Sequence, residues 1–89
     1  MDDDKLLALR NVGKTSSQWL HATGIHTPEQ LRQLGPVAAY LAVRARGFNA
    51  SKALLFAIAG ALQDVHWNDL EPTYKRQLLE QLAQAGDAD

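Results

Sequence analysis

The feature that most constrains this chain is an uncharged apolar run over residues 53–62. None of its ten side chains is charged or forms hydrogen bonds. On a helix, at about 100° per residue, its large side chains gather on one face and its small ones on the other. A membrane span needs about 20 apolar residues, so the run is too short to cross a bilayer. We predict a central helix in the core of a small domain, with a large-residue face of Leu54, Leu55, Ile58 and Leu62.

The rest of the chain favours further helices, because no segment alternates polar and apolar residues as a half-buried strand does. We predict an all-α, compact domain of five to six helices around the central one. The other predicted helices cover residues 3–10, 14 or 15 to 23, 28–34, 36–46 and 72–85. Residues 66–70 are predicted to form a compact turn in which Trp67 and Leu70 fold back onto the core.

Local signals mark several of these helix ends. Gly24-Ile25 and Gly47-Phe48 each have the glycine and following apolar residue of a Schellman stop. Thr27-Pro28-Glu29-Gln30 combines a capping residue, a proline in the first turn and a glutamine three residues after the cap, which together predict a helix start. Asn49 or Ser51 is expected to cap the central helix.

Length and composition indicate one domain over residues 1–89, with residues 1–4 and 86–89 expected to be frayed. The sequence has no cysteine, which excludes disulfides, thiolate zinc sites and cysteine nucleophiles. Its acidic beginning resembles neither a secretory signal nor a transit peptide. We therefore expect a cytoplasmic protein without a membrane segment.

Charge is unevenly distributed although the net charge is −1. Residues 5–52 carry seven basic residues and one acidic residue, whereas residues 53–89 carry two basic and six acidic residues. A basic region can form a phosphate-binding face. It can equally be the solvated side of several helices or pair with the acidic region, so charge alone leaves these alternatives open.

The segment Leu9-x-x-Val12-Gly13-Lys14 followed by Trp19-Leu20 resembles a helix-hairpin-helix motif. In that motif, backbone N–H groups at the start of the second helix point outward and can bind an anion such as a phosphate. Such contacts carry no base readout. Asn11 stands where the motif usually has its first glycine, and its side chain is expected to hinder a close phosphate. The candidate backbone-binding residues are Arg10, Asn11, Gly13, Lys14, Thr15 and Lys52.

A purely structural hairpin that only packs helices fits the same segment. The pattern of residues 9–13 recurs at residues 31–35, a shift of 22, and suggests two helix–turn–helix units built alike. The second turn is expected to be structural, because Pro36 lacks an N–H group and no lysine follows it.

Catalysis is not indicated. His21, His26 and His66 are placed on three different elements, and their spacings match no helical metal pair. No glycine-rich nucleotide loop is present. We therefore expect no catalytic residue, metal, cofactor or small-molecule substrate. His66 and Trp67, beside the end of the central helix, are the candidates for docking a protein partner.

A set of short motifs recurs in one known family: Leu9-Arg10-Asn11-Val12-Gly13, Trp19-Leu20, Gly24-Ile25-His26-Thr27, Leu34-Gly35, Arg46-Gly47-Phe48, Gly60-Ala61-Leu62 and His66-Trp67. In these residues, over about residues 6–83, the chain resembles the C-terminal domain of the TfoX/Sxy family. The resemblance implies a helical domain with hairpins like those of nucleic-acid-binding helix-hairpin-helix proteins. Family members regulate natural competence and are associated with activating DNA-uptake genes together with the cyclic-AMP receptor protein.

Two functions follow as hypotheses. The first is a non-enzymatic regulatory module of the competence-regulator type that binds nucleic-acid backbone without sequence specificity. The second is a protein-interaction domain, with a partner such as a transcription regulator and no nucleic-acid contact.

Overall fold

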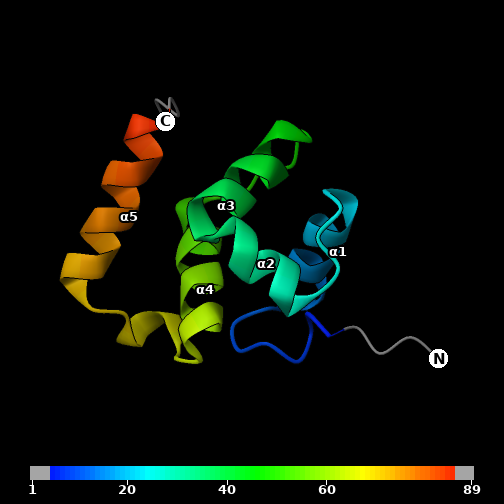
Figure 1. Ribbon diagram of the computed structural model, residues 1–89, viewed down its shortest axis with the longest axis horizontal. Helices are drawn as coiled ribbons and strands as arrows, with labels where there is room; N and C mark the ends of the chain where they lie inside the picture. Colours follow the sequence, from blue (N-terminus) through cyan, green and yellow to red (C-terminus); the bar gives the residue numbers. More distant parts are fainter. Residues whose placement is uncertain (1–4, 86–89) are drawn as a thin grey trace.

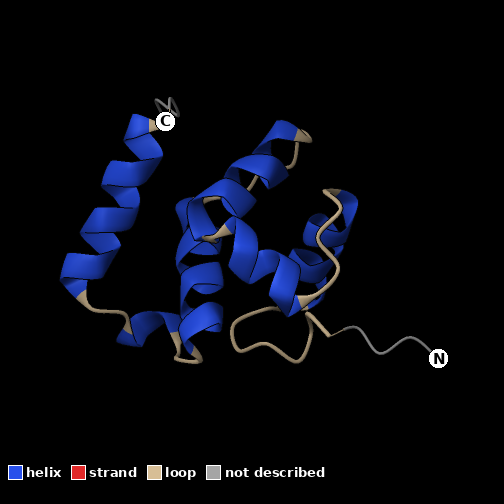
Figure 2. Ribbon diagram, in the orientation of Figure 1, coloured by secondary structure: helices blue, strands red, loops and turns tan. Residues whose placement is uncertain are grey.

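The computed structural model describes residues 5–85, so the predicted fraying of residues 1–4 and 86–89 lies outside the described residues. This part of the chain has five α-helices, one short 3-10 helix and no strand, which confirms the predicted all-α class (Figures 1 and 2). The elements in chain order are α1 (Lys14–Ala22), α2 (Pro28–Leu34), α3 (Pro36–Ala45), α4 (Lys52–Gln63), η1 (Trp67–Asp69) and α5 (Pro72–Gln84).

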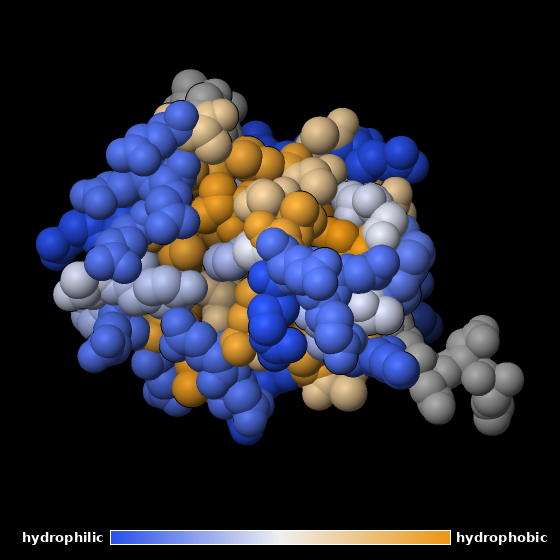
Figure 3. Space-filling view, viewed as in Figure 1, coloured by the Kyte–Doolittle hydropathy of each residue, from blue (hydrophilic) through white to orange (hydrophobic). Residues whose placement is uncertain are grey.

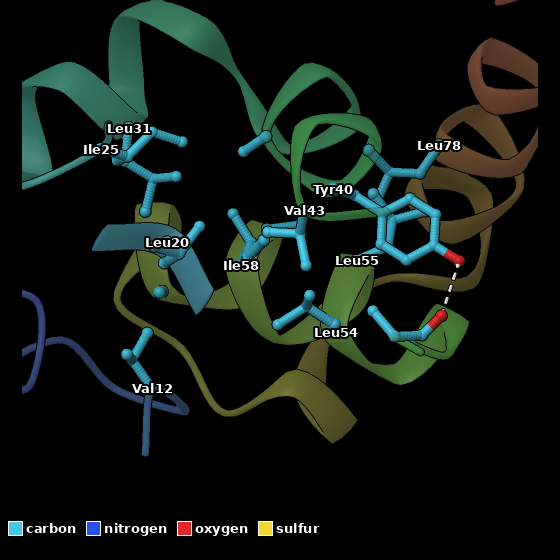
Figure 4. Close-up of a cluster of buried hydrophobic side chains, with 14 of the residues drawn as sticks. Val12, Leu20, Ile25, Leu31, Tyr40, Val43, Leu54, Leu55, Ile58 and Leu78 are labelled. Carbon is cyan, nitrogen blue, oxygen red and sulfur yellow. Dashed lines mark hydrogen bonds between the residues drawn. The ribbon is translucent and has the colours of Figure 1, made fainter. Parts of the chain in front are cut away.

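Helix α4 is the predicted central helix, and it packs against α2, α3 and η1. Leu55 and Ile58 on its large-residue face are fully buried (Figure 4). Side chains from α1, α2, α3 and α5 surround this face and complete one apolar cluster. In residues 5–85 the structure has no helix with the length and apolar character needed to cross a bilayer.

The small-residue face of α4 allows a close backbone approach at Gly60. A Cβ atom added there would lie 2.8 Å from the carbonyl oxygen of Val65 and 2.6 Å from Nδ2 of Asn11. Real Cβ contacts are longer than both distances. The segment that follows α4 can therefore fold back against this helix only because residue 60 has no side chain. Ala53, at the other end of the same face, is exposed.

The predicted Schellman stop after α1 is present. Gly24 has a φ of 90°, a left-handed conformation that glycine adopts without strain. Its N–H donates to His21 O at 3.0 Å, and the N–H of Ile25 donates to Leu20 O at 3.0 Å. Ile25 is buried, so the chain reverses direction around an apolar anchor.

The predicted start of α2 is confirmed as a capping box. The N–H of Gln30 donates to Oγ1 of Thr27 at 3.1 Å, and Gln30 Oε1 accepts the N–H of Thr27 at 3.2 Å. Ser51 is the N-cap residue of α4, but its side chain makes no capping hydrogen bond.

Two expectations were wrong. The described part of the predicted first helix, residues 5–10, forms successive turns. Its N–H groups bond three residues back, as from Leu9 to Leu6 O at 3.0 Å, and Asn11 then adopts a left-handed φ of 71°. So short a segment contains too few helical hydrogen bonds to offset nucleation. In the turn after α4, Leu70 is buried as predicted, whereas Trp67 remains 39% exposed.

The outer surface is hydrophilic over α5 and over α2, with a band of apolar residues between them over α3 (Figure 3). Helix α5 lies at one side of the molecule (Figure 1). It contacts the core through Leu78 and Leu82, which are both buried.

Tyr40 lies at the centre of α3, and its hydroxyl donates to Ala50 O at 3.4 Å (Figure 4).

Candidate nucleic-acid interface

The start of α1 is open to solvent. Gly13 is its N-cap residue and, having no side chain, makes no capping hydrogen bond. Gly13, Lys14 and Thr15 are all exposed. Among residues 5–85 no acceptor receives the N–H groups of these three residues, whereas the N–H of Val12 donates to Leu9 O at 3.3 Å. Three donors beside the ammonium of Lys14 form a surface suited to an anion.

Asn11 has a structural role. Its Nδ2 donates to Val65 O at 2.9 Å and to Ala57 O at 3.4 Å, and its Oδ1 accepts the N–H of Trp67 at 3.2 Å. The side chain therefore points toward α4 and η1, away from the exposed start of α1. The expectation that it would hinder a close phosphate does not fit this orientation.

Arg10 lies beside the C-terminal end of α4. Its Nε is 3.5 Å from Oδ1 of Asp64, and both side chains are exposed. An exposed pair of this kind contributes little to stability. Its consequence is electrostatic, because the Asp64 carboxylate offsets the charge that Arg10 would offer to a phosphate.

A groove of about 320 Å³ runs between α1 and the beginning of α4. Thr15 and Ser16 line one wall, Asn49 and Ser51 line the other, and the remaining lining is apolar (Trp19, Ala53, Leu54 and Ala57). Lys52 follows Ser51 directly, as the first residue of α4, and is exposed. Thr15 and Ser51 therefore line one groove although they are far apart in the sequence. Lys52, which follows Ser51, lies 37 positions after Thr15.

The second candidate surface, His66 and Trp67, lies at η1. The two ring centroids are 5.9 Å apart, and the ammonium of Lys75 is 5.9 Å from the centroid of the Trp67 ring. The His66 Nδ1 accepts the N–H of Asn68 at 3.1 Å. Asn11 thus connects the two candidate surfaces, because it precedes the start of α1 and bonds the backbone of Trp67.

The contact between His21 and His26 was not predicted from the sequence. Nδ1 of His21 and Nδ1 of His26 lie 2.6 Å apart, although the two residues were assigned to separate elements without a metal-like spacing. The available signal was the Gly24-Ile25 stop, which predicted a chain reversal between them. No group of three or more histidine, cysteine or acidic side chains suited to a metal occurs in residues 5–85.

Comparison with known proteins gives a family and two related structures. The TfoX C-terminal domain family matches residues 2–82 of the chain. An uncharacterized protein from Listeria monocytogenes, crystallised in a triclinic form, is 29% identical, with a TM-score of 0.83 over 94% of this chain and 97% of that chain. A protein of unknown function from the same organism, in a tetragonal form, is 31% identical, with a TM-score of 0.81 over 90% and 98% of the two chains. No curated protein sequence matches the chain.

Proposed function

The chain belongs to the TfoX C-terminal domain family, and on that premise we propose that it is a non-enzymatic regulatory module of the competence-regulator type. In this proposal the start of α1 binds the phosphate backbone of nucleic acid. The observation that carries it is the set of open N–H groups on Gly13, Lys14 and Thr15 beside an exposed lysine.

The binding mode follows from the chemistry of that surface. Backbone N–H groups and a lysine ammonium recognise the negative oxygens of a phosphate and do not distinguish one base from another. Thr15 and Ser16 also line the neighbouring groove, and exposed Lys52 directly follows the groove residue Ser51. Arg10 contributes less, because Asp64 lies beside it, and Asn11 supports the turn from inside.

The test is a fluorescence-anisotropy titration of labelled duplex DNA at about 50 and 200 mM salt. The wild-type affinity is expected to fall steeply with salt. Lys14→Glu is expected to weaken binding for every duplex sequence and to lower the salt slope by about one. Arg76→Glu, at an exposed position on α5, changes the net charge by the same amount and serves as the control.

Equal loss in the two variants would indicate a general charge effect and would contradict a site at α1. Absence of binding at the lower salt concentration would exclude the nucleic-acid proposal. The protein-interaction hypothesis then takes its place, because Trp67 is a large aromatic residue that remains 39% exposed beside His66. Exposed tryptophan is typical of residues that contribute most to protein–protein binding.

A further inference from the structure

His21 and His26 face each other across the turn that ends α1. Their Nδ1 atoms are 2.6 Å apart, their ring centroids are 4.9 Å apart and the ring planes differ by 26°. Because the two Nδ1 atoms are much closer to each other than the two ring centroids are, Nδ1 of each ring lies on the side that faces the other ring. Two facing nitrogens at this distance accommodate one proton, so one nitrogen donates and the other presents its lone pair.

The turn holds this arrangement at both ends. Thr23 Oγ1 donates to Leu20 O at 2.7 Å, and buried Ile25 anchors the chain after the reversal. On the far side, the N–H of His26 donates to Gln30 Oε1 at 2.7 Å. The backbone that carries both imidazoles is therefore fixed by hydrogen bonds and by the core, which reduces the entropy lost when the two rings bind one ligand.

We propose that His21 and His26 form a two-imidazole site for a borderline divalent transition-metal ion such as Zn²⁺, Ni²⁺ or Cu²⁺. Neutral imidazole nitrogen is the commonest protein ligand for these ions. The metal ion takes the place of the shared proton and is bound by Nδ1 of both rings. At Zn–N distances of about 2.1 Å and a tetrahedral angle, the two nitrogens lie roughly 3.4 Å apart.

The rings reach that separation by a small outward rotation, and His26 is exposed and has room to move. Within residues 5–85 no group of three or more histidine, cysteine or acidic side chains suited to a metal occurs, so the described part of the site consists of the two imidazoles. Two nitrogen ligands distinguish this site from the all-oxygen shells of Ca²⁺ and Mg²⁺. The expected order of affinity is Cu²⁺ above Ni²⁺ and Zn²⁺.

The experiment titrates the whole chain with ZnCl₂, and separately with MgCl₂, and follows both heat release and thermal unfolding. Zn²⁺ is expected to bind one equivalent and to raise Tm by about 10–20 °C when free Zn²⁺ is roughly 100 times Kd, because it binds the folded pair more tightly than separate histidines of the unfolded chain. Mg²⁺ is expected to change neither measurement.

Three variants locate the site. His21→Gln and His26→Gln are each expected to abolish the Zn²⁺-dependent rise in Tm, whereas His66→Gln, at the histidine next to Trp67, retains it. Circular dichroism without metal establishes that each variant is folded. Zinc binding that survives in both pair variants, or a wild-type Tm that Zn²⁺ leaves unchanged, would overturn the proposal and leave the pair as a proton-sharing contact.

Discussion

The turns at residues 9–13 and residues 31–35 begin with the same Leu-Arg pair and end with glycine, yet they are built differently. In the first turn the left-handed residue is Asn11, and its side chain bonds groups on α4 and η1. In the second turn it is Gly35, whose N–H donates to Leu31 O at 2.9 Å within the same turn. One turn is held by distant parts of the chain and the other by its own backbone.

This difference decides which turn offers donors to a ligand. The first turn leads into α1 through Gly13, whose φ of −96° is extended backbone, and the following N–H groups are open. The second leads into α3 through Pro36, which has no N–H group. At the second turn the N–H of Gly35 is bonded to Leu31 O and Pro36 has no N–H, so two of the three donors equivalent to those of Gly13, Lys14 and Thr15 are unavailable to a ligand.

Removing the support of the first turn is expected to have the largest effect. Asn11→Ala leaves Val65 O and the N–H of Trp67 without this partner and places alanine, which tolerates the left-handed region less well than asparagine, at a φ of 71°. We expect the free energy of unfolding to fall by about 2–4 kcal/mol, measured by urea denaturation. Gln33→Ala, at the equivalent exposed position of the second turn, is expected to change it by less than about 0.5 kcal/mol. Equal effects would mean that the turns are supported alike.

Gly60→Ala tests the support of the first turn from the α4 side of the contact between Asn11 and Gly60. Its Cβ would lie 2.6 Å from Nδ2 of Asn11 and 2.8 Å from Val65 O, so we expect a loss of about 1–3 kcal/mol in the same assay. Because one of the two clashes is with the Asn11 side chain, the double variant Asn11→Ala/Gly60→Ala should lose less than the sum of the single variants. Strict additivity would show that the two residues do not interact.

Gly35→Ala tests the local support of the second turn. Alanine at a φ of 87° is strained, and the expected loss is about 1–2 kcal/mol by urea denaturation. Gly13→Ala is the matched control, because its φ is negative and no atom lies within 4 Å of an added Cβ. If both variants lost the same stability, backbone strain at Gly35 would not be the cause.

The smallest expected effect is a gain. Gly13→Ser adds a capping hydroxyl at a residue that already has extended backbone, and we expect a few tenths of a kcal/mol of added stability. The same hydroxyl competes for the open N–H groups of α1, so DNA affinity should fall in the anisotropy titration while stability rises. A variant that gains stability and binds DNA as tightly as wild type would contradict a phosphate site at these donors.

The sequence predicted those parts of the fold that depend on near neighbours. The stop at Gly24, the capping box at Thr27 and the central apolar helix each follow from residues within about one turn of one another. Periodicity and capping chemistry act over that range, so they can be read without knowing the fold.

The sequence could not predict the contacts that determine the candidate site. Asn11 bonds Val65 and Trp67 across 54 and 56 positions, and no local pattern specifies such a pairing. The His21–His26 contact depends on side-chain directions after a reversal whose existence, but not whose geometry, was predicted. The segment before Asn11 has helical spacing of its leucines, yet tertiary contacts hold it as turns with Leu6 buried.

The bonds of Asn11 have a consequence for how the domain opens. A single carboxamide closes a ring of more than fifty residues, with the leading turns at one end and η1 at the other. The entropic cost of closing so large a ring rises only slowly with its length. When the hydrogen bonds of the Asn11 side chain break, residues 5–12 and η1 are released together. Amide protons of both segments should therefore exchange with solvent as one cooperative unit.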